Sequence, residues 1–359
     1  MATHPKLGFA LVGCGRIAVR HAELLGSGRI EGASLSAVCD LVEERAKAFG
    51  ERWGVPAFTS AETMMEALGN RIDVLSILTP SGSHAKLTVD LAVHGKHILV
   101  EKPMALTLED ADAMIAACDA AGVKLFVVKQ NRFNLPVTHL REAFDAGRFG
   151  KIVMGTVRVR WRRDQAYYDQ ADWRGTWAQD GGVFANQASH HVDLLEWFLG
   201  EPESVYATAR TALVNIETED TGVAVIRFRN GAIGVVEATT AARPRDLEGS
   251  LSILGEKGTV EIGGFAVNEM RVWQFADAQP EDEAVRQNAH TNPPNVYGFG
   301  HAAYLHNVVE TIRNGKRALV DGLEGRKSLE LISAIYESIF SRQEVHLRFR
   351  ARQSRLGRA

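Results

Sequence analysis

A glycine-rich turn near the start of the chain constrains the fold more than any other feature. An apolar run at residues 7–12 is followed by the turn Gly13-Cys14-Gly15-Arg16-Ile17-Ala18, and a helical pattern continues to about residue 26. The first glycine permits a tight reversal, the second lets a pyrophosphate approach the backbone, and the small sixth residue lets the helix pack closely on the strand. The helix N-terminus then faces the phosphates. The turn therefore predicts a dinucleotide-binding unit in which Gly13–Ile17 contact the cofactor.

The next apolar run points to the kind of dinucleotide. Residues 35–39 end in Asp40, which lies 22 residues after Ala18. A carboxylate at this distance accepts hydrogen bonds from a ribose diol and repels a 2′-phosphate. No arginine directly follows Asp40. The pattern predicts NAD as the cofactor, in preference to NADP.

Strand-like and helix-like segments then alternate to about residue 129. The clearest strands are 74–78, 97–100 and 124–128, and the clearest helices are 84–94 and 107–120. This alternation is typical of a doubly wound parallel sheet, which binds ligands at the carboxyl ends of its strands. Several polar residues follow such ends and are predicted to converge on one crevice: Thr79, Lys102, Gln130, Asn131 and Arg132.

One strand end is unusual in its chemistry. The run His97–Val100 is followed by Glu101, Lys102 and Pro103. Proline lacks an N–H and restricts its own φ, so the strand stops there, and the Lys–Pro bond is a candidate for the cis form. This places an ammonium on a rigid corner beside the cofactor. We therefore interpret Lys102 as a catalytic or substrate-orienting group and Glu101 as a residue that orients the lysine or the cofactor.

After residue 150 the pattern changes to longer strands, near 151–162, 203–213, 221–229, 232–240, 249–254 and 258–262. Asn230-Gly231 is a strong signal for a two-residue hairpin. We expect an α/β chain with an N-terminal Rossmann domain (1–129), an α+β domain with a large, mostly antiparallel sheet (130–347) and a basic tail (348–359). An open sheet of this kind leaves one face to cover. It predicts a homo-oligomer, a dimer or a tetramer, formed through the C-terminal sheet.

A second polar constellation follows Gly181-Gly182. Asn186, His190 and Asp193 stand at i, i+4 and i+7, which places them on one face of a helix over 181–193. Histidine has the pKa range that suits removal of a hydroxyl proton near neutral pH. We interpret His190 as the catalytic base and Asn186 and Gln187 as substrate contacts. An ordinary helix with two satisfied histidines remains the alternative.

The composition excludes several classes of protein. The net charge of −3 provides no field for nucleic acid or an anionic membrane. The 3 cysteines are widely spaced and form no CxxC pair, which argues against a disulfide framework or a zinc site and favours the cytoplasm. No apolar run reaches the ~20 residues of a membrane helix. The sequence predicts no metal centre.

These motifs together resemble the glucose–fructose oxidoreductase/inositol dehydrogenase (Gfo/Idh/MocA) family. The resemblance spans nearly the whole chain and rests on the glycine turn, on Thr79-Pro80 with His84, on Glu101-Lys102-Pro103 and on the run 181–193. It implies hydride transfer between NAD and a sugar-like carbinol, with Pro80 and His84 at the cofactor. The family's lysine corresponds to Lys102 and its histidine to His190. The family often has aspartate where this chain has Asn186.

Asn186-Gln187 and the run 129–134 are also similar to a narrower group of enzymes. The resemblance implies oxidation of C3 of UDP-N-acetylglucosaminuronic acid in the synthesis of bacterial O-antigen sugars. Arginines are suited to such an anionic substrate, although pairing with surface acids explains them equally well. The predicted substrate contacts are Lys102, Arg132, Arg160, Trp173, Asn186, Gln187, His190 and Arg243. Two alternatives remain open, a dehydrogenase of a free sugar or inositol and an NAD-dependent glycosidase of similar fold.

The assignment of Asp40 can be tested directly. Asp40→Ala should weaken NADH binding and reduce the discrimination against NADPH, because the ribose diol loses its acceptor and the 2′-phosphate loses a repelling charge. Fluorescence titration of the variant with NADH and NADPH measures both affinities. An unchanged ratio of the two dissociation constants would contradict the predicted ribose contact.

Overall fold

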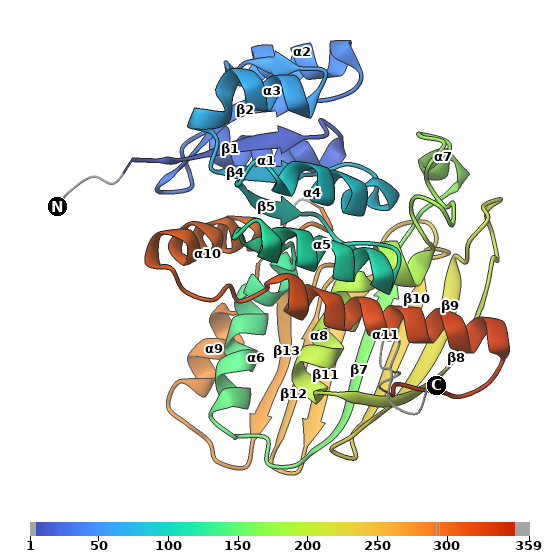
Figure 1. The fold of residues 1–359 in the computed structure, drawn as a ribbon. Helices are drawn as coiled ribbons and strands as arrows, with labels where there is room; N and C mark the ends of the chain where they lie inside the picture. Colours follow the sequence, from blue (N-terminus) through green and yellow to red (C-terminus); the bar gives the residue numbers. More distant parts are fainter. Residues whose placement is uncertain (1–4, 292, 294, 349–359) are drawn as a thin grey trace, which may run out of the picture.

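The computed structural model describes residues 5–291, 293 and 295–348. The described chain forms two sheets, a six-stranded one at the top of Figure 1 and an eight-stranded one below it. The basic tail predicted from residue 348 lies outside the described residues apart from Arg348. Among the described residues, no helix is both long and apolar enough to span a membrane.

The first sheet is parallel and has the strand order β3-β2-β1-β4-β5-β6. Its strands are β1 (Leu7–Val12), β2 (Ala33–Cys39), β3 (Ala57–Phe58), β4 (Val74–Ile77), β5 (His97–Val100) and β6 (Leu125–Val127). Its helices are α1 (Arg16–Gly26), α2 (Glu43–Trp53), α3 (Ala61–Leu68), α4 (His84–Ala92) and α5 (Leu108–Ala120). The predicted doubly wound sheet is confirmed.

The local signals that delimit these helices act as the sequence indicates. The side chain of Thr107 caps α5 by accepting a hydrogen bond from the Asp110 N–H at 3.1 Å. Gly95 and Gly122 follow α4 and α5 with φ values of 68° and 66°, a conformation that glycine adopts without steric cost. Each strand therefore restarts promptly after its helix.

The second sheet has the order β13-β12-β11-β7-β10-β9-β8-β14. Its strands are β7 (Ile152–Arg160), β8 (Pro202–Arg210), β9 (Thr221–Phe228), β10 (Ile233–Thr239), β11 (Glu248–Gly255), β12 (Gly258–Gly263), β13 (Glu269–Phe275) and β14 (Val345–His346). All neighbours are antiparallel except β7 and β10, and the Asn230-Gly231 turn joins β9 to β10 as predicted. Strands β13 and β14 were not predicted from the sequence. A predicted α+β domain with a mostly antiparallel sheet is confirmed.

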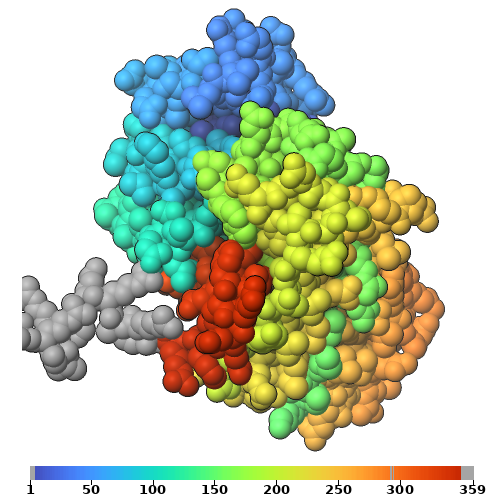
Figure 2. Space-filling model, turned by 90° about the vertical axis from the view of Figure 1, so that its right-hand side faces the viewer, coloured from blue at the N-terminus to red at the C-terminus, as the bar shows by residue number. Residues whose placement is uncertain are grey.

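The remaining helices are α6 (Leu135–Asp145), α7 (Gln165–Tyr168), α8 (Ser189–Leu199), α9 (Asp282–Asn288), α10 (Gly300–Asn314) and α11 (Gly322–Ser341). Helix α10 comes late in the chain, yet Tyr304, Leu305 and Val308 pack into the apolar core around β1 of the first sheet. Helix α11 contacts both α5 and β8, and Figure 2 shows it in red between the teal first domain and the yellow strands. Two segments from the end of the chain therefore tie the domains together.

A buried ion cluster reinforces this junction. Arg132 lies in the short 3₁₀ helix Gln130–Phe133 and donates to both oxygens of Asp193 in α8, at 2.7 and 2.8 Å. Its third contact is Glu324 in α11, at 2.9 Å. The Arg132 side chain is 3% exposed and that of Asp193 is 2% exposed. Since a buried charge without its partner is strongly destabilising, the three elements depend on one another.

We expect Arg132→Met to destabilise the protein by about 3–5 kcal/mol, because the buried Asp193 carboxylate loses both hydrogen bonds from Arg132 and keeps only Lys129, at 3.5 Å, to balance its charge. Arg317→Met is the matched control, since Arg317 pairs with Asp321 on the surface and is 73% exposed. The control should leave the unfolding midpoint in urea unchanged. Equal midpoints for both variants would show that the cluster does not stabilise the junction.

Candidate active site

A cavity of 1640 Å³ lies between the two domains. Its first wall comes from the glycine turn and the carboxyl ends of β2, β4 and β5. Its second wall comes from the segments 161–187 and 295–299 together with His190. Single small-molecule sites usually occupy about 300–1,000 Å³, so this cavity has room for two ligands side by side.

The glycine turn has the geometry that a phosphate-binding loop needs. Gly13 has φ = 99°, and a Cβ there would lie 2.9 Å from Thr79 and 3.0 Å from Leu78. A Cβ at Gly15 would meet no atom within 4 Å, which leaves open space above the N-terminus of α1. Arg16 and Ile17 line the cavity, whereas Cys14 is buried behind it. The structure therefore fits a pyrophosphate over Gly15.

Asp40 lies at the end of β2 and lines the cavity. Its Oδ2 accepts from the Cys14 N–H at 2.8 Å and its Oδ1 accepts from the Val42 N–H at 2.9 Å, so the carboxylate has a defined orientation. Arg45, five residues later, reaches it at 3.4 Å. The sequence interpretation considered only the residue directly after Asp40 and missed this arginine, which one further helical turn brings back to the carboxylate.

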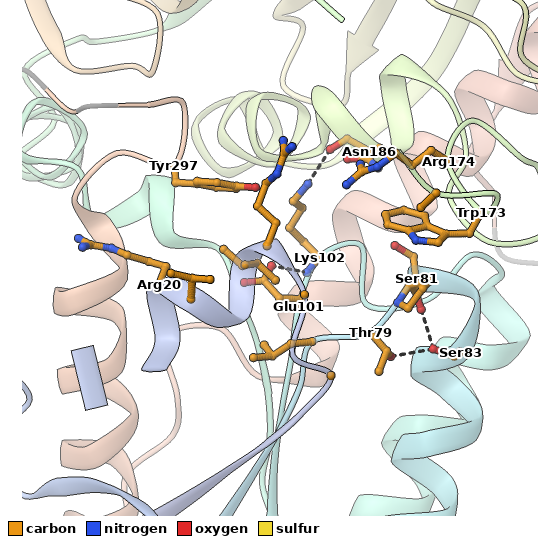
Figure 3. A pocket seen from close by; sticks show the side chains of 18 of the residues that line it. Arg20, Thr79, Ser81, Ser83, Glu101, Lys102, Trp173, Arg174, Asn186 and Tyr297 are labelled. Atoms are coloured by element: carbon orange, nitrogen blue, oxygen red, sulfur yellow. Dashed lines mark hydrogen bonds between the residues drawn. The ribbon is translucent and has the colours of Figure 1, made fainter. Parts of the chain in front are cut away.

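The register of the first sheet brings the predicted polar residues together. Ile77 pairs with Val100, and Val100 pairs with Val127, so β4, β5 and β6 end level with one another. Thr79 and Lys102 thus emerge at one edge, and Gln130 follows from β6. Figure 3 shows Thr79, Glu101 and Lys102 rising from neighbouring strands into the cavity.

His84 connects two of these strand ends without entering the cavity. Its Nδ1 lies 2.9 Å from the carbonyl oxygen of Pro103, and its Nε2 lies 2.9 Å from that of Thr79. The ring is buried, and it fastens the turn after β5 to the turn after β4. His84 and Cys14 are therefore neighbours of the cofactor loops, and Pro80 lines the cavity itself.

Lys102 spans the crevice. The Lys102–Pro103 peptide bond is cis, as considered from the sequence. Nζ of Lys102 donates to the carbonyl oxygen of Asn186 at 2.7 Å, which uses one of its three N–H bonds (Figure 3). Burial lowers the pKa of this ammonium, and the carboxylates of Glu101 and Asp180 oppose the effect. Lys102 therefore presents its terminal nitrogen to the cavity, with donor capacity beyond the contact with Asn186.

Glu101 is buried beneath the lysine. Burial by itself raises the pKa of its carboxyl, but the rings of His21 and His301 reverse this and hold it well below its usual value. His21 Nε2 lies 3.1 Å from Glu101 Oε1, and His301 Nε2 lies 3.8 Å from the same oxygen. Each of these three residues offers one atom that could ligate a metal ion, and these atoms all lie within 4.8 Å of one another. The sequence contains no spacing that signals this group.

His190 opens α8 and lines the second wall of the cavity. Burial and the ammonium groups of Lys102 and Lys129 hold its pKa well below the usual value, so the ring is neutral near pH 7. Its Nδ1 is buried without a hydrogen-bond partner among the described groups. This leaves Nε2 as the nitrogen that can take a proton from a ligand in the cavity.

The helix expected over 181–193 is interrupted. Residues Val183–Gln187 form a π-helical turn and α8 begins only at Ser189, so the i, i+4, i+7 relation does not hold across the break. Asn186 and His190 line the cavity, whereas Asp193 points to Arg132. The expectation of one common face in the cavity was wrong for Asp193, which lies almost one turn further along α8 than His190 and is enclosed by Arg132 and Lys129.

The three arginines predicted to contact substrate are engaged elsewhere in the structure. Arg132 is enclosed by Asp193 and Glu324, Arg160 pairs with Glu237 and Glu248 on the sheet, and Arg243 donates to backbone carbonyls. None of these three lines the cavity, and neither does Asn131. The suitability of arginine for an anionic substrate selected these residues, but it could not show which arginines face the cavity. The cavity arginines on the second wall are Arg162, Arg163, Arg174 and Arg245, beside the predicted Trp173 and Gln187.

Other cavity residues were missed by sequence reasoning. Arg20 lies one helical turn after Arg16 on α1, and Tyr297 belongs to the loop before α10. Figure 3 shows both side chains on the same side of Lys102. Helical spacing from Arg16 is a signal that could have found Arg20. Nothing local marks Tyr297, because its position depends on α10 returning to the first sheet.

The chain combines a Rossmann sheet, which carries an NAD-type acidic residue, with a second sheet domain. A lysine and a histidine line the cavity between them. These features are typical of a two-domain NAD-dependent dehydrogenase. Residues 7–129 match "Oxidoreductase family, NAD-binding Rossmann fold", and residues 141–347 match "Oxidoreductase family, C-terminal alpha/beta domain". The chain belongs to this family, the Gfo/Idh/MocA oxidoreductases.

Solved structures and curated relatives agree with this assignment. The WlbA dehydrogenase of Bordetella pertussis, in complex with NADH and UDP-GlcNAcA, is 45% identical with a TM-score of 0.91, over 98% of this chain and 100% of that one. WlbA of Chromobacterium violaceum, with the same ligands, is 43% identical with a TM-score of 0.89, over 98% and 100%. Myo-inositol 2-dehydrogenase of Thermotoga maritima is 28% identical over 94% of this chain and 97% of that protein.

The two glycines of the turn should respond differently to alanine. Gly15→Ala should fold normally, because its φ of −81° and its open surroundings accept a Cβ, yet it should weaken NADH binding at least tenfold by obstructing the pyrophosphate. Gly13→Ala should lower the melting temperature, because it combines a positive φ with contacts near 3 Å. Fluorescence titration and thermal unfolding of both variants test the distinction. Normal NADH affinity in Gly15→Ala would contradict the assigned loop.

Proposed function

We propose that the protein oxidises the 3-hydroxyl of UDP-linked 2-acetamido-2-deoxyglucuronic acid to a ketone with NAD. The observation that carries this proposal is the cavity, whose volume of 1640 Å³ fits a cofactor and a nucleotide sugar together and whose second wall is rich in arginine. The two WlbA dehydrogenases, with 43% and 45% identity, carry NADH and UDP-GlcNAcA in their structures.

Arg174 is the best-placed group for an anionic part of the substrate. Its guanidinium lies 4.5 Å from the ring centres of both Tyr167 and Trp173, and one nitrogen donates to the Tyr167 hydroxyl at 2.7 Å. Arg174 also lines the cavity. An arginine that packs against two rings and faces a cavity is suited to bind a carboxylate or a phosphate.

His190 and Lys102 have different roles in the proposed reaction. NAD, when bound, supplies the acceptor for the hydride that leaves the carbinol carbon. Nε2 of His190 takes the hydroxyl proton, since the ring is neutral and lines the cavity. Lys102 donates a hydrogen bond to the same oxygen and stabilises its developing negative charge. The Lys102 contact with Asn186 fixes the position of the ammonium before substrate arrives.

The cellular setting belongs to the same proposal. The enzyme would act in the cytoplasm, in the synthesis of O-antigen or lipopolysaccharide sugars. The open face of the second sheet exposes Val153, Tyr206, Val225 and Ile233, each between 45% and 55% exposed. A sheet face with these apolar side chains is suited to contact a second copy of the chain. We therefore propose a homodimer or homotetramer formed through this face.

A second candidate is a dehydrogenase of a free sugar or inositol. The relative from Thermotoga maritima, named a myo-inositol 2-dehydrogenase, supports it at 28% identity. Free inositol has no anionic group, so this candidate leaves Arg174 and its neighbours without a ligand. The two candidates therefore differ in whether the substrate is charged.

Substrate profiling separates the candidates. We expect NADH to form with UDP-GlcNAcA but not with UDP-GlcNAc, glucose or myo-inositol, because only the first presents a uronate carboxylate to the cavity arginines. Absorbance at the NADH wavelength under multiple- and single-turnover conditions is the measurement. Turnover of myo-inositol in preference to the nucleotide sugars would favour the second candidate.

His190→Asn provides the accompanying test of the base. It should lower kcat by about 10²–10⁴-fold with the best substrate, because the proton then has no acceptor. Asparagine preserves most of the volume, so NADH affinity and melting temperature should stay near the parent values and serve as controls. Near-normal kcat would remove His190 from the proposed role.

A further inference from the structure

A buried carboxylate lies behind the catalytic pair, outside the cavity. Asp180 is 2% exposed and belongs to the loop that precedes the π-helical turn. Its Oδ2 accepts from the Gly175 N–H at 2.7 Å, and its Oδ1 accepts from the side-chain amide of Asn186. Neither oxygen faces a ligand, so the carboxylate acts only through its neighbours.

The first neighbour is Asn186. Because its Nδ2 is bound to Asp180, the amide cannot turn over, and its Oδ1 is left to accept from Gln187 Nε2 at 3.2 Å. The backbone carbonyl of the same residue accepts from Lys102 Nζ at 2.7 Å. Asp180 therefore fixes the position of Asn186, whose backbone carbonyl in turn binds Lys102.

Asp180 also acts on the charge of Lys102. Four charged groups bear on this ammonium: the carboxylates of Glu101 and Asp180 stabilise the charge, and Lys129 and Arg163 oppose it. Glu101 is already engaged with His21 at 3.1 Å. Lys102 and Arg174 in turn stabilise the charged form of Asp180, whose pKa burial raises above the usual value. Asp180 is thus the carboxylate on the second-domain side of the lysine.

The loop that carries Asp180 is anchored on the first domain. The Gly82 N–H donates to the carbonyl oxygen of Gln179 at 3.1 Å. A Cβ at Gly82 would lie 2.3 Å from the carbonyl oxygen of Ala178, so the two backbones are in close contact. The position of Asp180 therefore follows the first domain, from which Lys102 also comes.

We infer that Asp180 is a positioning residue that fixes the Asn186 amide and keeps Lys102 charged and directed across the crevice. The inference rests on the proposed role of Lys102. It adds a residue that touches neither substrate nor cofactor and that no local motif marks. The side chain at position 186 is an amide, and the carboxylate that serves this site comes from the loop six residues earlier.

Asp180→Asn tests the charge, because asparagine keeps an acceptor oxygen for Asn186. We expect kcat to fall about tenfold, which corresponds to the loss of about 1.4 kcal/mol of electrostatic stabilisation of the Lys102 ammonium. The alkaline limb of the kcat/KM profile should move to lower pH by about one unit, since an opposite charge no longer raises the pKa of Lys102. In the unliganded enzyme, trace acetylation of Lys102 at pH 8, followed by mass spectrometry, should become faster for the same reason.

Asp172→Asn is the matched control, since Asp172 is an exposed acid in the same segment. It should alter neither the pH profile nor the labelling rate. The exchange Asp180→Asn/Asn186→Asp restores one carboxylate and one amide in contact. It should recover most of the kcat lost in Asn186→Asp alone, where two carboxylates meet.

The outcomes distinguish the possibilities. Unchanged labelling of Lys102 and an unchanged alkaline limb in folded Asp180→Asn would overturn the inference, as would an exchange variant no better than Asn186→Asp. If Asp180→Asn does not fold, the exchange variant decides alone. The labelling needs no substrate, and turnover uses whichever sugar reduces NAD fastest. A failed proposal for UDP-GlcNAcA would therefore leave this test intact.

Discussion

The hydrogen bond from Lys102 Nζ to the carbonyl oxygen of Asn186 is the contact on which the site depends. It joins the carboxyl end of β5 in the first domain to the π-helical turn in the second, over 2.7 Å. A lysine can make this contact only if both ends are held in place. His84 fastens the turn after β5 to that after β4, and Asp180 fastens the Asn186 amide. The geometry of the proposed catalytic site is therefore a property of the domain junction.

Buried charge is the main electrostatic feature of that junction. Burial, together with the charges of Lys102 and Lys129, holds the pKa of His190 well below its usual value, so the ring is neutral near pH 7. Carboxylates balance the charges of these cations. Glu101 and Asp180 stabilise the charge of Lys102, and Asp193 pairs with both Lys129 and Arg132. The ion pairs of Asp193 with Lys129 and Arg132 are buried and cost desolvation energy, so their value lies in fixing the elements relative to one another. The charges that organise the site are the same charges that hold the domains together.

Local patterns predicted the cofactor half of the site well and the substrate half only in part. The Gly13 turn, Asp40 and Lys102 are determined by residues adjacent in sequence, and parallel strands deliver their ends to a common edge. Arg132, Arg160 and Arg243 were chosen because arginine suits anions, and all three are engaged elsewhere in the structure. Arg174 and Tyr297 line the cavity instead, because segments remote in sequence fold over it. An arginine's function is decided by its partners, which a local pattern does not contain.

The sequence by itself determined the doubly wound sheet, the mostly antiparallel second sheet and the preference for NAD, and it selected Lys102 and His190, which line one cavity. These follow from hydrophobic periodicity, from glycine conformations and from functional groups at strand ends, all of which act over short stretches of chain. Only the tertiary structure decided that α10 completes the first domain, that Asp193 pairs with Arg132 outside the cavity, and that Asp180 holds the Asn186 amide. Such contacts join residues whose nearness is set by packing, and no short stretch of sequence encodes them.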